Sequence, residues 1–159
     1  MTTKNTDLVA NFEATPPVLN NAAELAGVVR TAHGSVELAA GDSTDNDIVM
    51  LAPIPSNAAV PQLFIGSDTF GGSCTFNVGI YQTDGTVKDE DIFASSVADA
   101  AALTDVRFEA ADLNTGSKKL WELAGDSTDP GGYFYIAITF DATGGTAGTL
   151  NWNINYVVN

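Results

Sequence analysis

The residue types able to do covalent or metal chemistry are scarce in this sequence, which holds one histidine, His33, and one cysteine, Cys74. Any Ser-His-Asp triad, Cys-His pair or histidine metal site would have to use His33. A lone cysteine forms no internal disulfide and no cysteine-based zinc site. Cys74 stands at the start of a predicted strand, where we expect a buried, unreactive thiol. These counts predict no catalytic, cofactor-binding or metal residues, and therefore no enzyme.

Two tripeptides bear on a protease hypothesis. Thr31-Ala32-His33 and Gly41-Asp42-Ser43 resemble fragments of trypsin-like protease motifs, but the glycines that follow the motif serine are missing. A triad is defined by geometry rather than by tripeptides, and 159 residues are too few for a double barrel. His33 also alternates with Ser35 and Glu37, which places it on the polar face of a predicted strand.

The segment Ala-Gly-Asp-Ser-Thr-Asp occurs twice, at residues 40–45 and 124–129, each time before a predicted strand. Asp and Ser side chains bond nearby backbone amides and so close such loops, which is the role we expect. The alternative is calcium, with oxygen ligands from Asp42, Asp45 and Asp47. The spacing lacks the central glycine and distant glutamate of an EF-hand.

Two further patterns have simple structural interpretations. Asp89-Glu90-Asp91 is a carboxylate run, but glycosidases need a second, facing carboxylate, and the start of a helix explains the run more simply. The glycines of residues 144–148 lie between two predicted strands, whereas a phosphate-binding loop opens a helix.

Tyr133 and Tyr135 alternate with Phe134, so they are expected on an outer face, as an exposed patch or an intersubunit contact.

Charge limits the partners. Six Lys and Arg oppose twenty Asp and Glu, giving a net charge of −14. Such a surface repels phosphate, so we expect neither nucleic acid nor an anionic membrane as a partner.

No apolar run approaches the roughly 18 residues of a membrane helix, and the first residues lack a signal peptide's apolar stretch. Synthesis in a cytoplasm, without secretion by that route, is the expectation.

Period-2 alternation dominates the chain after Gly27 and predicts strands. Asp84-Gly85 predicts a type I′ hairpin turn, and the glycine-rich loop 141–148 predicts a second hairpin. The predicted strands are 28–38, 47–52 (a central strand), 60–66, 75–81, 106–109 and two C-terminal runs on either side of that loop. Helical spacing predicts Asp89–Leu103, and a Ser117 cap with Gly125 predicts a second helix over 117–124. The expected fold is an all-β antiparallel sandwich, jelly-roll-like, with about eight strands and two short helices.

Residues 1–27 differ from the rest. They contain Pro16-Pro17 and spaced apolar residues such as Leu8, Phe12 and Leu19. Proline disfavours a regular helix, so we expect an extended N-terminal arm that docks on a partner, followed by a β-sandwich domain over 28–159.

Four segments resemble small virion structural proteins of marine tailed phages: Arg30–Leu38, Asp47–Leu51, Gly79–Val87, and Lys119–Leu123 continuing to Asp129–Gly132. In order they span roughly residues 28–140. Several such proteins resemble capsid decoration (cement) or head-fibre proteins. The resemblance implies a β-sandwich that forms a homotrimer in the virion and binds the major capsid protein through a terminal arm. The resemblance implies no catalytic, cofactor-binding or metal-binding residues in this sequence.

We therefore expect a phage capsid decoration protein that binds the major capsid protein lattice and stabilises the head. The alternative is a receptor- or glycan-binding fibre or tail module, with an exposed aromatic patch around Tyr133 and Tyr135.

Overall fold

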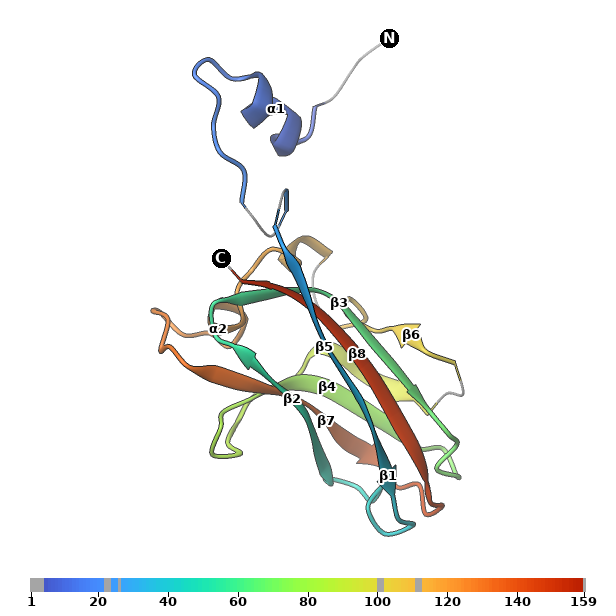
Figure 1. Ribbon diagram of the computed structural model, residues 1–159. Helices are drawn as coiled ribbons and strands as arrows, with labels where there is room; N and C mark the ends of the chain where they lie inside the picture. The colour runs from blue at the N-terminus through green and yellow to red at the C-terminus, as the bar shows by residue number, and fades with distance from the viewer. Residues whose placement is uncertain (1–4, 22–23, 26, 100–101, 111–112, 159) are drawn as a thin grey trace.

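The computed structural model describes residues 5–21, 24–25, 27–99, 102–110 and 113–158. Eight strands in this part of the chain form two antiparallel sheets that pack face to face (Figure 1). Sheet A has the order β1-β8-β3-β6, with bounds Val29–Leu38, Gly148–Val158, Ala58–Ser67 and Thr104–Asp105. Sheet B has the order β2-β7-β4-β5, with bounds Ile48–Pro55, Tyr133–Ala142, Thr75–Tyr81 and Val87–Ala98.

This strand order is that of a jelly roll, because consecutive strands change sheet at every step except β4 to β5. The predicted fold class is confirmed: an all-β sandwich of eight described strands with two short α-helices. The helices are α1 (Asp7–Glu13) and α2 (Leu120–Leu123), and a three-residue 3-10 turn spans Leu113–Thr115. No helix among the described residues is long and apolar enough to cross a membrane.

The core forms where the inner faces of the sheets meet, and the period-2 pattern predicted it well. Phe76, Val78 and Ile80 of β4 are buried, as are the alternating apolar residues of β7. Phe140 of β7 meets Phe70 and Phe76 edge-on, at ring-centroid distances of 5.6 and 6.2 Å. Such edge-to-face contacts add to the hydrophobic stabilisation from burial.

The loop after β7 was wrongly interpreted as a hairpin. β7 and β8 belong to different sheets, and the loop crosses one end of the sandwich. There the Gly144 amide donates to the Ser43 carbonyl at 2.8 Å. A side chain at position 144 would lie within 2.8 Å of Phe70 atoms, so glycine is required. Alternation identifies strands but not the sheet that each one joins.

The prediction of a central strand at residues 47–52 was also wrong, since β2 is the edge strand of sheet B. Its apolar run reflects two apolar faces: Ile54 is buried inside, and Ile48 and Met50 are exposed outside. Pro53 and Pro55 suit an edge, because proline cannot donate to another strand.

The predicted helix Asp89–Leu103 is a strand in its described part, β5, which ends at Ala98. Bulges in its pairing with β4 disturb the period of two, and Ser96 has a φ of 51°. Ala94 and Val97, which pair with the buried Val78 and Phe76, are therefore three residues apart instead of two, and this spacing imitates a helical pattern. Residues 100–101 lie outside the described part of the chain.

Three smaller corrections concern turns and ends. The hairpin at Asp84-Gly85 is confirmed, but only Gly85 has a positive φ, so the turn is not type I′. Helix α2 is capped by Glu122, whose carboxylate accepts from the Lys119 amide at 2.8 Å, rather than by Ser117, and Gly125 follows it as predicted. The strand expected over 106–109 is displaced to the two residues of β6, and turns follow.

An extended conformation was wrongly predicted for the segment that forms α1. The prolines come after Asp7–Glu13, so they end this helix rather than prevent it. Asp7 occupies the first turn, where the helix dipole favours an acid. Figure 1 shows α1 beyond one end of the sandwich.

Candidate functional site

The segment around α1 folds on itself. Asn5 donates from its side chain to Glu13 at 3.0 Å, and Asn11 donates to Asn20 at 2.8 Å. Asn20 donates in turn to the Leu8 carbonyl at 3.2 Å, and the Val18 amide to the Asn11 carbonyl at 3.0 Å. These bonds hold residues 5–20 in a hook, in which the chain after Pro16-Pro17 returns along α1.

This hook exposes its apolar side chains. No residue of α1 is buried, Phe12 is 77% exposed and Leu19 is 96% exposed. Of thirteen large apolar side chains exposed in the described part of the chain, four lie on the hook (Val9, Phe12, Val18 and Leu19), and three more (Leu25, Val28 and Val29) follow it up to the first residue of β1. Apolar groups gathered in this way on a projecting segment are typical of a surface that binds a partner.

His33 lies exposed on the outer face of β1, paired across the sheet with Asn153. Its neighbours are polar, and Thr31 donates to Asn155 at 2.9 Å. Ser43 is buried in the loop beyond the end of β1, so at least five strand residues, about 17 Å, separate the two side chains. The structure therefore does not bring together the two tripeptides of the protease hypothesis.

The first Asp-Ser loop closes on itself, as predicted. Asp42 accepts from the Ala39 amide at 2.9 Å, and Asp47 accepts from the Thr44 amide at 2.8 Å and from the Thr44 hydroxyl. These bonds lower the pKa of Asp47, the Thr44 hydroxyl most and then the Thr44 amide. Among the described residues, no group of three acidic, His or Cys side chains is arranged to hold a metal ion.

The second loop uses its carboxylates differently. Asp129 accepts from the buried Ser56 hydroxyl at 2.6 Å and from the Gly131 amide at 2.8 Å. Asp126 instead forms an ion pair with Lys88 at 2.7 Å. Identical hexapeptides thus fold into different local structures, because their flanking residues differ.

The acidic run 89–91 lies on a bulge of β5 rather than on a helix. Burial raises the pKa of Asp89, and its interaction with the Asp91 side chain adds to the increase. The Asp89 carbonyl stands where a side chain on Gly79 would have to lie, only 2.1 Å from an added Cβ. The bulge therefore depends on glycine at position 79.

Cys74 is a buried free thiol, as expected. Burial, followed by the negative charges of Asp99 and Asp141, raises its pKa to about 11. A thiol of this kind stays protonated and is a poor nucleophile at neutral pH.

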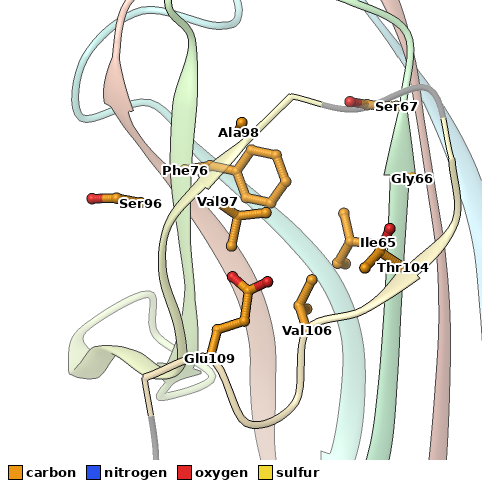
Figure 2. Close-up of a pocket in the computed structure, with 10 residues that line it drawn as sticks. All are labelled: Ile65, Gly66, Ser67, Phe76, Ser96, Val97, Ala98, Thr104, Val106 and Glu109. Atoms are coloured by element: carbon orange, nitrogen blue, oxygen red, sulfur yellow. The ribbon is translucent and has the colours of Figure 1, made fainter.

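A cavity of about 350 Å³ opens between the edges of the two sheets (Figure 2). Its apolar walls include Ile65, Phe76, Val97 and Val106, and Glu109 points its carboxylate into it. Glu109 is the one ionisable group among its described lining residues. The cavity can hold an apolar group. General acid–base catalysis by two carboxylates would need a second carboxylate beside Glu109, and the described lining residues do not include one.

Arg107 is a buried residue that the sequence interpretation assigned to a strand. Burial lowers its pKa to about 10, an effect that Asp105 partly opposes. Its Nε donates to the Val60 carbonyl at 2.6 Å and one Nη to the Thr115 carbonyl at 3.1 Å. These contacts fix the loop after β6 against β3. In the sequence, the neighbouring aromatic Phe108 was the one feature that could have indicated that Arg107 is buried.

Tyr133 is 57% exposed, whereas Tyr135 is half-buried on the same outer face of β7. The prediction that both side chains face away from Phe134 is confirmed. Trp152 is half-buried and packs against the core.

The fold and the projecting hook define a single jelly-roll protein with an exposed apolar N-terminal segment. No protein-family model and no curated protein matches the sequence. The fold is similar to that of a chain in the cyanophage Pam1 capsid asymmetric unit, with a TM-score of 0.54 and 18% identity over 84% of this chain and 86% of that chain.

Two other solved structures align less closely. A chain of infectious bursal disease virus, Gx strain, gives a TM-score of 0.47 and 15% identity over 82% of this chain and 32% of that one. A chain of the Helicobacter pylori bacteriophage KHP30 capsid gives 0.37 and 13% over 82% and 94%. The Pam1 likeness establishes the fold, shared with a chain of comparable length.

Proposed function

We propose that this chain is a virion structural protein, and specifically a decoration (cement) protein that stabilises a phage capsid. In this role the jelly-roll body, residues 28–159, lies on the capsid surface. The N-terminal arm, residues 1–27, binds the major capsid protein lattice. The observation that carries the proposal is the concentration of exposed apolar side chains on the hook around α1.

Burial of these side chains against a partner supplies the driving force. Roughly 25 cal/mol is gained per Å² of apolar surface removed from water, so Phe12 and Leu19 alone represent a few kcal/mol. The likeness to a chain of similar length from a phage capsid supports the same role. The net charge of −14 favours solubility of free copies before assembly.

The test measures co-sedimentation of the purified protein with heads of the parent phage that lack it. Deletion of residues 1–27 should leave a folded body, judged by circular dichroism, that no longer sediments with heads. Leu19→Ser should weaken binding, whereas Leu113→Ser, which changes a body leucine that is 81% exposed, should not. Full binding by the truncated protein would refute the arm's role.

We also propose that the free or capsid-bound protein is a homotrimer. Analytical ultracentrifugation should give the mass of three 16.5 kDa chains. A monomer both free and on heads would remove this part of the proposal without affecting the arm.

A further inference from the structure

A second surface, built by other segments than the hook, has the composition of a ligand site. A pocket of about 200 Å³ lies between the β4–β5 hairpin and the loop before β7. Tyr133, Gln82, Thr83, Lys88 and Asp126 are among its lining residues. It combines one exposed aromatic ring with several polar groups that face the same space.

The two walls of this pocket are tied together. Lys88 of β5 and Asp126 of the opposite loop form the one ion pair found in the described part of the chain. Asp126 is also fixed through its backbone amide, which donates to the Trp121 carbonyl at 3.0 Å. On the same loop, Asp129 bonds the buried Ser56 hydroxyl and the Gly131 amide. The pocket is therefore preformed, which lowers the entropy lost on binding.

Hydrogen-bonding capacity remains in the pocket. A lysine ammonium has three donors, and the ion pair uses one of those of Lys88. The Gln82 side-chain amide lines the same space and can both donate and accept.

The shape and charge of the pocket narrow the ligand class. Its volume is below the roughly 300 Å³ of the smallest drug-sized sites, so it suits a single ring. The Lys88–Asp126 pair has no net charge, and the protein as a whole repels anions. A neutral pyranose offers a face that packs on an aromatic ring and hydroxyls that both donate and accept.

We infer that this pocket binds one ring of a neutral saccharide, with Tyr133 against the ring face and Lys88 and Gln82 bonding its hydroxyls. The inference is independent of the proposed capsid role. On a virion surface, such a site would hold the particle weakly to a glycan-coated cell, and many copies would add avidity.

The experiment titrates ¹⁵N-labelled full-length protein with the methyl glycosides of glucose, galactose, mannose and N-acetylglucosamine, and of glucuronate as an anionic comparison. At least one neutral glycoside should shift amide signals of residues 82–88 and 126–134. Tyr133→Ser should weaken that binding by about tenfold, equivalent to about 1.4 kcal/mol. Phe12→Ser, which removes a still more exposed aromatic from the hook, should bind like the wild type.

Three results would each overturn the inference: no signal shifts with any neutral glycoside at the highest soluble concentration, shifts clustered elsewhere, or equal binding by a folded Tyr133→Ser protein. Tighter binding of the glucuronide than of every neutral glycoside would refute the neutral ligand class.

Discussion

The guanidinium carbon of Arg107 lies 4.8 Å from the centroid of the Phe93 ring, so a buried cation stacks on an aromatic residue of β5. The Phe108 ring is 4.6 Å away, and Val60 of β3 accepts a hydrogen bond from the same side chain. One residue thus joins β3, β5 and the loop after β6. This matters because β6 contributes only two residues to sheet A.

Replacement of Arg107 by alanine should lower the free energy of unfolding by about 3–5 kcal/mol, because it removes the buried hydrogen bonds to the Val60 and Thr115 carbonyls and leaves a void between two rings. Arg30 is the matched control, since it is exposed on β1. Its alanine variant should change stability by about 0.5 kcal/mol or less. Urea denaturation followed by tryptophan fluorescence measures both, and equal effects would contradict the role given to Arg107.

Gly79→Ala should destabilise the protein by about 3 kcal/mol or more, because the new Cβ meets the Asp89 carbonyl and β5 must move. Gly41→Ala is the comparison, since nothing lies within 4 Å of a Cβ there. Thermal melts of the two variants test the bulge. A Gly79→Ala protein with the melting temperature of the wild type would show that β5 can move away from the new Cβ without loss of stability.

Asp129 should stabilise the protein at neutral pH but not in strong acid. The Ser56 hydroxyl and the Gly131 amide lower its pKa below the ordinary value of 3.8, so its contribution is present above that pH and is lost as the pH falls through the folded-state pKa. Asp129→Asn should therefore lower the melting temperature at pH 7, and this difference should shrink as the pH is taken below 3.8.

Asp89 should show the opposite sign. Burial raises its pKa above 3.8, so the ionised group destabilises the folded state at neutral pH, and the penalty disappears on protonation. Asp89→Asn is expected to raise the melting temperature at pH 7 and to have little effect below pH 3.8. Because general charge repulsion acts on all variants, differences from the wild type at each pH are the quantity to compare. A loss of stability at pH 7 would contradict this.

Cys74 should react slowly with iodoacetamide in the native state. Its pKa of about 11 and its burial should reduce alkylation at pH 8 by about 100-fold or more relative to the protein in urea. Mass spectrometry of timed samples follows the reaction. Comparable rates with and without urea would mean that the segment around Cys74 opens readily.

The sequence predicted those parts of the fold in which pairing is regular. Val78 and Ile80 keep the period of two and were placed correctly in the core, whereas a bulge of β5 puts the inward-facing Ala94 and Val97 three residues apart, as in a helix. Bulges and sheet membership depend on partner strands, so local spacing does not reveal them.

The features of the candidate sites were likewise predictable only where they depend on local alternation. Exposure of Tyr133 follows from alternation along one strand, and it was predicted. The apposition of Lys88 and Asp126 joins residues 38 positions apart on separate elements, so it required the folded chain. The hook around α1 depends on local asparagine bonds that composition alone did not indicate.

The edge position of β1 has a consequence for biosynthesis. Its partner in sheet A is β8, the last of the eight strands to leave the ribosome. A nascent chain therefore carries its N-terminal segment on a strand that has nothing to pair with until translation reaches residues 148–158. Only then is that segment attached to a finished body, so incomplete chains cannot present it on a folded jelly roll.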